Sequence, residues 1–149
     1  MPSWIGTPMT TPDAKGARII LDLCGGTGAW SRPYAEAGYD VRLVTLPEQD
    51  VRTYEPPERV WGVLAAPPCT EFAVSGARWW ARKPKRLLVE AVEVWVACRR
   101  IIKACNPEWW ALENPVGRLK HWAGPHSWSY QPWEYGDNQF KRTLIWGTA

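Results

Sequence analysis

A short apolar run at residues 18–23 leads directly into a glycine-rich turn, Cys24-Gly25-Gly26-Thr27-Gly28. An apolar run without polar alternation is typical of a strand buried on both faces, as in a parallel sheet. The glycines allow the backbone to turn sharply and to approach a ligand closely. Residues 31–37 can then form a short helix that Gly38 ends. A strand followed by a tight turn and a helix is how a parallel α/β fold begins.

The rest of the chain continues this alternation. Further apolar runs predict strands over residues 40–45, 61–65, 109–112 and 142–146. Pro67-Pro68 must end the third strand, because proline cannot donate to a sheet. From Pro84 to Cys105, apolar residues recur at three- and four-residue steps and predict a helix, which Asn106-Pro107 stops. The stripe consists of Leu88, Val92, Trp95, Cys98 and Ile102.

We therefore predict a single α/β domain over residues 1–149, with a mostly parallel sheet flanked by helices and right-handed crossovers. Residues 1–17 contain several prolines and glycines and are expected to form an irregular N-terminal arm. A chain of 149 residues is long enough for one core and too short for two ordinary domains.

Composition excludes several classes of protein. No apolar run approaches the roughly 20 residues of a membrane helix, and no secretory pattern opens the chain, so we expect a cytoplasmic protein. The four cysteines form no CxxC pair, which argues for reduced thiols and against a zinc site; two lone histidines add no metal site. A net charge of +3 permits a polyanionic partner. Most of the twelve tryptophans are expected in the core, and some could stack on bases.

Three short motifs each follow a predicted strand, where open α/β sheets bind their ligands. The first is the glycine turn after Asp22-Leu23. The second is Pro67-Pro68-Cys69-Thr70-Glu71-Phe72-Ala73, in which two prolines stiffen the backbone before a potential nucleophile. The third is Glu113-Asn114-Pro115, in which a carboxyl group could hydrogen-bond a heterocyclic base or exchange a proton with it.

Each motif also has a simpler interpretation. Glycine turns after strands are common, Asn-Pro is an ordinary turn, and most free cysteines are small buried apolar residues. We assign that last interpretation to Cys24, Cys98 and Cys105. The glycine spacing is GxxG and no lysine follows, so neither a dinucleotide fingerprint nor a phosphate-binding P-loop is indicated.

Taken in this order and spacing, the three motifs resemble those of the DNA cytosine-5 methyltransferase family. The glycine turn is similar to the family's DLFxGxG, the Cys69 segment to PPCQxFS, and Glu113-Asn114 to ENV. Gln139-Phe-Lys-Arg-Thr-Leu-Ile-Trp-Gly147 is similar to the segment that carries QxRxR. The resemblance covers residues 18–147 and implies a Rossmann-like fold that binds S-adenosylmethionine, in a shortened form.

The resemblance implies a role for each catalytic residue. Cys69 would attack C6 of cytosine, which makes C5 nucleophilic enough to take the methyl group. Glu113 would hold the N3 and N4 edge of the base, and Asn114 and the backbone near Pro67 would hold the loop. Either Lys141 or Arg142 matches the basic member of the fourth motif, since two registers fit.

On the cofactor side, the resemblance implies contacts from two segments and from Pro67. Asp50 stands where the family has a carboxylate for the adenine amino group, and Thr45-Leu46 replace the acid expected for the ribose, with Glu48 as a possible substitute. The implied contacts of the first segment are Asp22, Cys24, Gly25, Gly26, Thr27 and Gly28. Cys24 replaces a phenylalanine that packs on adenine, so we expect weaker or rearranged cofactor binding.

A basic, aromatic stretch follows Cys69, where the family has a mobile loop that closes on DNA. Cations next to tryptophans suit phosphate contact with base stacking, although a solvated loop whose tryptophans pack inward is the alternative. The predicted DNA contacts are Arg78, Trp79, Trp80, Arg82, Lys83, Lys85 and Arg86.

The family's separate target-recognition domain has no counterpart in residues 1–149. The enzyme could have relaxed specificity, depend on a partner chain for recognition, or act on single-stranded nucleic acid or a nucleotide, since duplex DNA would require base flipping. A protein that binds S-adenosylmethionine or nucleic acid without catalysis is a further alternative. A dehydrogenase fits less well. So compact a core suits a virus or a mobile element such as a phage.

Overall fold

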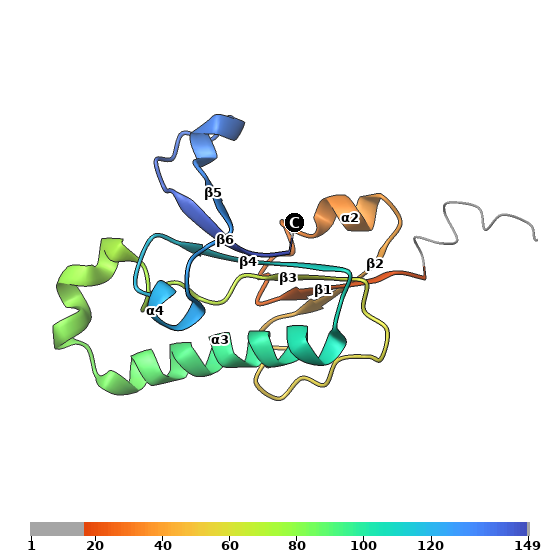
Figure 1. Cartoon of the computed structure of the whole chain (residues 1–149), viewed down its shortest axis with the longest axis horizontal. Helices are drawn as coiled ribbons and strands as arrows, with labels where there is room; N and C mark the ends of the chain where they lie inside the picture. Colours follow the sequence, from red (N-terminus) through yellow and green to blue (C-terminus); the bar gives the residue numbers. More distant parts are fainter. Residues whose placement is uncertain (1–16, 149) are drawn as a thin grey trace, which may run out of the picture.

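A single six-stranded sheet organises the chain, in the order β2-β1-β3-β4-β6-β5 (Figure 1). The computed structural model describes residues 17–148, so the predicted N-terminal arm lies, except for Ala17, outside the described residues. The strands are β1 (Ile19–Leu23), β2 (Asp40–Val44), β3 (Gly62–Ala65), β4 (Trp109–Pro115), β5 (Trp128–Tyr130) and β6 (Thr143–Gly147).

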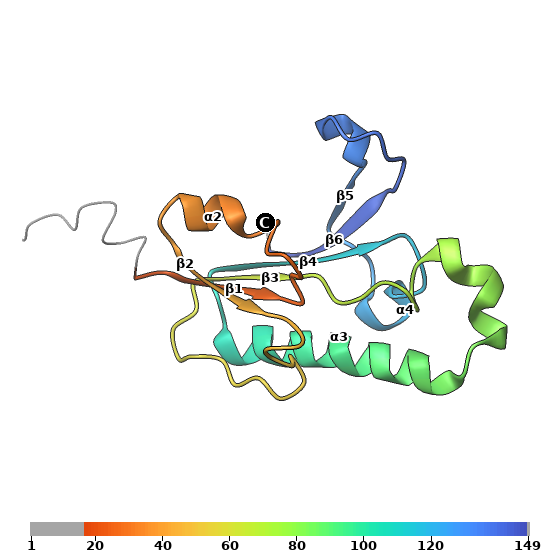
Figure 2. The same cartoon turned by 180° about the vertical axis from the view of Figure 1, so that it is seen from behind.

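Helices lie on both faces of this sheet (Figures 1 and 2). The 21-residue α3 (Lys85–Cys105) runs along one face, and the five-residue α2 (Arg32–Glu36) lies on the other. The remaining helical segments are the 3₁₀ helices η1 (Val74–Arg82) and η2 (Pro132–Tyr135) and the short α4 (Lys120–Ala123). None of the described helices has the length and apolar character that a membrane crossing requires.

The core fills the space between α3 and the sheet. Cys98 and Ile101 of α3 are fully buried together with Leu21 and Leu23 of β1 and Val63 of β3. Leu88, Val92 and Trp95 of the predicted stripe pack against this cluster. The helix begins directly after Pro84 and ends at Cys105. The next residue, Asn106, has a φ of 42°, a left-handed conformation that cannot continue a right-handed helix.

The sheet is only partly parallel. β1 pairs in parallel with β2 and β3, and β3 pairs in parallel with β4, as predicted. β6, however, runs antiparallel to both β4 and β5. The hairpin that contains β5 was not predicted, and β4 extends three residues beyond its predicted end at Leu112 to Pro115. Glu113 and Asn114 therefore lie within β4 and not in a loop after it, because pairing with β6 extends the strand.

Candidate active site

The glycine turn after β1 encloses a buried carboxylate. Asp22 is fully buried, and the hydroxyl of Ser31 donates a 2.5 Å hydrogen bond to its Oδ2. A Cβ atom on Gly25 would collide with this carboxylate, so only glycine allows the turn to pass so close. Burial raises the pKa of Asp22, and the hydrogen bonds with Ser31 lower it in part. Its Oδ1 has no hydrogen-bond partner among the described residues and is free to accept from a cationic ligand.

The other members of the turn surround an open space. Cys24, Gly26 and Gly28 adopt positive φ angles of 59°, 59° and 76°. A Cβ atom on Gly26 would meet nothing within 4 Å, and Thr27 beside it is exposed. Ligand atoms can therefore approach this part of the backbone closely.

A small cavity of about 170 Å³ lies beside the turn. It brings together Cys24 of the turn, Leu46 and Asp50 of the segment after β2, and Pro68 of the second motif. The volume is below the roughly 300–1,000 Å³ of whole-ligand pockets and suits one flat heterocyclic group. Glu48 is exposed and does not line the cavity.

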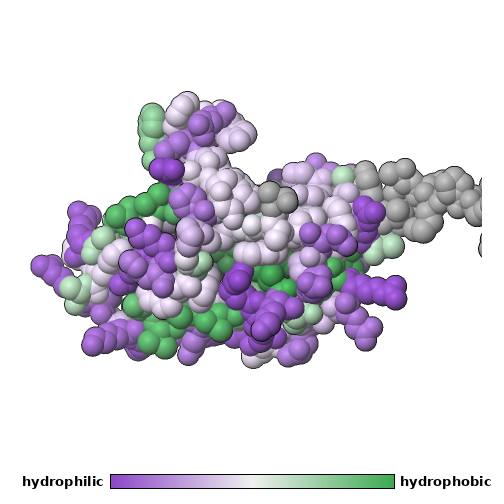
Figure 3. Space-filling model, in the orientation of Figure 1, coloured by the Kyte–Doolittle hydropathy of each residue, from purple (hydrophilic) through white to green (hydrophobic). Residues whose placement is uncertain are grey.

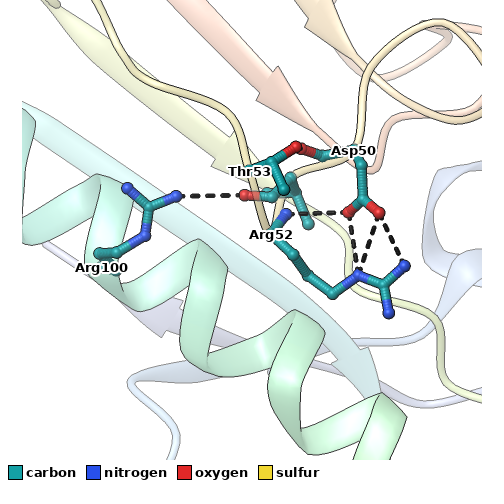
Figure 4. Close-up of polar contacts among 5 residues, drawn as sticks. Asp50, Arg52, Thr53 and Arg100 are labelled. Carbon is teal, nitrogen blue, oxygen red and sulfur yellow. Dashed lines mark hydrogen bonds and ion pairs between the residues drawn. The ribbon is translucent and has the colours of Figure 1, made fainter.

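Asp50 is already engaged in this structure (Figure 4). Its Oδ1 accepts from the backbone N–H of Arg52 at 2.9 Å and from Nε at 3.0 Å, and its Oδ2 accepts from Nη2 at 2.7 Å. These bonds lower the pKa of Asp50. Oδ2 also lies 3.1 Å from Nε, whose single hydrogen is shared between the two oxygens, so Arg52 engages both oxygens of the carboxylate. An adenine amino group would have to compete with Arg52 for Asp50.

The loop that carries Cys69 is held from both sides. The side-chain amide of fully buried Asn114 donates to the carbonyl of Pro67 at 3.0 Å, which joins the third motif to the second. On the far side, the backbone N–H of Arg118 donates to the carbonyl of Phe72 at 2.9 Å. Gly117 lies so close to Phe72 that a Cβ atom would collide with its carbonyl. Cys69 itself is half-buried and a free thiol.

Glu113 lies on the opposite face of β4 from Asn114, because side chains alternate along a strand. Burial raises the pKa of Glu113, and the nearby charge of Lys141 lowers it in part. Arg142 instead donates from Nε and Nη2 to the hydroxyl of Ser129, at 3.1 and 2.9 Å. Lys141 is thus the member of this pair whose charge acts on Glu113, whereas Arg142 is bonded to Ser129.

The basic stretch after Cys69 forms η1 and is tied to the loop before it. Lys83 donates to Glu71 at 2.8 Å, and the Arg118 guanidinium lies 4.0 Å from the ring centre of Trp80. Trp79 is 45% exposed, with the guanidinium groups of Arg78 and Arg82 over its ring. Lys85 and Arg86 are exposed at the start of α3. Lys83 and Trp80 are therefore structural as well as candidate contacts.

Three supporting residues were missed from the sequence: Ser31, Glu71 and Arg118. A buried acid requires a donor, so Asp22 could have prompted a search for one in the following helix. The Glu71 carboxylate and the Arg118 stack have no comparable sequence signal. No group of three His, Cys, Asp or Glu side chains within residues 17–148 could hold a metal ion.

Comparison with known proteins gives one similarity. No family model matches the chain. The chain is 27% identical over 124 residues to the Type II methyltransferase M.DdeI of Desulfomicrobium norvegicum, an alignment that covers 67% of this chain and 28% of that protein. The chain thus spans less than a third of that relative's length.

Proposed function

We propose that this chain transfers a methyl group from S-adenosylmethionine to C5 of cytosine in DNA through a covalent adduct of Cys69. The similarity to a methyltransferase supports methyl transfer in general. The observation that carries the finer proposal is the hydrogen bond from Asn114 to Pro67, because it fixes the Cys69 loop to the strand that carries Glu113. β3, which leads into the Cys69 loop, lies between β4 and β1, and β1 leads into the glycine turn.

The residues present fit part of S-adenosylmethionine. The unpaired Oδ1 of Asp22 suits its amino group, the open backbone at Gly26 suits close approach of its methionine chain, and the small cavity suits its adenine. Asp50 is the exception, since Arg52 occupies it. When bound, the cofactor would supply an electrophilic methyl group.

Residues of the chain itself would activate the base and release the product. The Cys69 thiolate would add to C6 and place electron density on C5. Glu113 has a raised pKa, so its protonated form could donate to N3 of the base while the charge develops. Loss of the C5 proton and release of Cys69 would restore the aromatic ring. The sulfur would thus be recovered unchanged.

Methyl transfer from labelled S-adenosylmethionine tests this proposal. The substrates are duplex DNA, single-stranded DNA, RNA and dCMP. The variants are Cys69→Ala and, as a matched control, Cys105→Ala, which removes a buried core thiol at the end of α3. We expect label at cytosine C5 that disappears in Cys69→Ala alone. Label elsewhere, or label that survives Cys69→Ala, would refute the covalent mechanism.

A non-catalytic protein that binds S-adenosylmethionine or nucleic acid is the second candidate. The engagement of Asp50 by Arg52 favours a protein that does not transfer methyl groups by itself, because the adenine amino group would have to compete with Arg52 for this carboxylate. A partner-dependent enzyme makes the same prediction for the isolated chain. Calorimetric binding of S-adenosylmethionine without methyl transfer to any substrate would support this pair of alternatives over the stand-alone enzyme.

A further inference from the structure

The face of the sheet opposite α3 carries a large aromatic groove. It has a volume of about 760 Å³ and lies between α2 and the β5 hairpin. Leu64, Ala111 and Ile145 form part of its lining from three neighbouring strands, and the aromatic residues include Trp30, Trp109 and Trp128. The surface between α2 and β5 is pale in Figure 3, as expected where tryptophan and tyrosine predominate. The five-residue α2 therefore leaves much of this face open.

This aromatic groove is continuous with Glu113. In the sheet register, Glu113 lies beside Ile145 and Ile145 lies beside Trp128. Residues in one such row point to the same face, about 5 Å apart from strand to strand. Burial raises the pKa of Tyr130, which lines the groove, and the nearby charge of Glu113 raises it as well. A ligand that reaches Glu113 can therefore extend onto the aromatic rings.

Positive charge lies against the aromatic groove, and its lining carries no acid. The Arg18 guanidinium is 4.9 Å from the ring centre of Trp61, which lines the groove. Lys141 lies close enough to Glu113 for its charge to offset in part the rise in pKa that burial causes in that carboxyl group. No Asp or Glu is among the described residues that line the groove. Flat aromatic faces beside positive charges match a ligand that has flat rings and a polyanionic backbone.

We propose that the aromatic groove binds unpaired nucleobases next to the target base, so that single-stranded nucleic acid is the preferred substrate. This inference rests on the proposed function for the identity of the target base. Stacking on aromatic rings does not require the bases to be paired in a duplex. An unpaired target would avoid the unstacking energy of base flipping.

Binding of a fluorescein-labelled oligonucleotide of about 12 nucleotides, with one cytosine, tests the inference. Anisotropy titrations without S-adenosylmethionine would compare the single strand with its duplex. The variants are Trp128→Ala and Tyr135→Ala, whose side chains line the groove and are 40% and 81% exposed. The matched control is Trp133→Ala, which lies on the same hairpin, is 50% exposed and does not line the groove.

We expect the wild type to favour the single strand, and Trp128→Ala to weaken single-strand affinity roughly 5- to 100-fold without changing the salt dependence, because stacking is lost and no phosphate contact is. Trp133→Ala should bind like the wild type. Equal affinities of Trp128→Ala and Trp133→Ala would overturn the inference. So would a wild-type dimer that Trp128→Ala dissociates in sedimentation, because the groove would then join two copies of the chain.

These outcomes are separate from the test of methyl transfer. Cys69-dependent methylation together with unaffected single-strand binding in Trp128→Ala would overturn the groove inference and leave the proposed function intact. Loss of binding in Trp128→Ala together with no methylation by the wild type would refute the proposed enzyme and leave a nucleic-acid-binding groove.

Discussion

The hydrogen bond from Ser31 to Asp22 provides a test of the structure at the glycine turn. Ser31→Ala would remove the donor to Oδ2 of a carboxylate that is already without a partner at Oδ1. Hydrogen bonds to charged groups contribute about 1.5–3 kcal/mol to stability. For a domain of this size, that loss corresponds to a fall in Tm of roughly 3–12 °C.

The stability lost in Ser31→Ala should depend on pH in a defined direction. Burial raises the pKa of Asp22 above its ordinary value of 3.8, so the free energy of unfolding falls as pH rises through the window above 3.8. Ser31 lowers this pKa, so removing Ser31 raises the folded-state pKa further, extends the fall to higher pH and increases the total loss of stability. Ser31→Ala should therefore cost more stability at neutral pH than in acid, where Asp22 is protonated in both states.

Urea titrations of the wild type and Ser31→Ala at about pH 3 and about pH 8 would measure this difference. Ser127→Ala is the matched control, because its hydroxyl donates to the Gly147 carbonyl at the surface and involves no charge. Its small effect should be the same at both pH values. If the loss in Ser31→Ala were equal at both pH values, or no larger than in Ser127→Ala, the assignment of a buried, hydrogen-bonded carboxylate would be wrong.

Two further predictions concern the third motif. Asn114→Ala leaves the buried carbonyl of Pro67 without its donor, so the free energy of unfolding should fall by about 1–3 kcal/mol in urea titration; an unchanged value would remove the basis for a fixed Cys69 loop. Glu113 is proposed to act in its protonated form, so methyl transfer by the wild type should fall as pH rises through a pKa raised above 4.5, and Glu113→Gln should lose that limb of the pH profile. The same limb in both proteins would exclude Glu113 as its source.

The elements predicted from the sequence share strong local signals. Backbone chemistry marks the ends of strands and helices at the Gly25 turn, at Pro67-Pro68 and at Asn106. The three- and four-residue spacing of apolar residues in α3 determines which face of that helix is buried. The β5 hairpin has only three residues in its strand, and those residues are polar or aromatic, so no period could reveal it. β4 was predicted to end at Leu112 because Asn114-Pro115 is typical of a turn, whereas proline is tolerated at the end of a strand.

The candidate site shows the same division between local and long-range information. The grouping of the motifs followed from their places after neighbouring parallel strands. The pairing of Asp50 with Arg52 did not, because an acid two residues before an arginine has no fixed geometry in sequence. Nor did the different surroundings of Lys141 and Arg142, which lie just before β6, because they depend on how the chain approaches that strand.

The open edge of the sheet at β2 has a consequence for self-association. Among the described strands, β2 pairs only with β1, so its outer row of backbone groups is available to another extended chain. Arg42 and Asp40 form an ion pair of 3.0 Å on this edge strand, and both side chains are partly exposed. Charged side chains on an edge strand oppose the stacking of strands that builds amyloid fibrils. The Arg42–Asp40 pair thus acts against fibril growth, a role separate from any chemistry at the other end of β2.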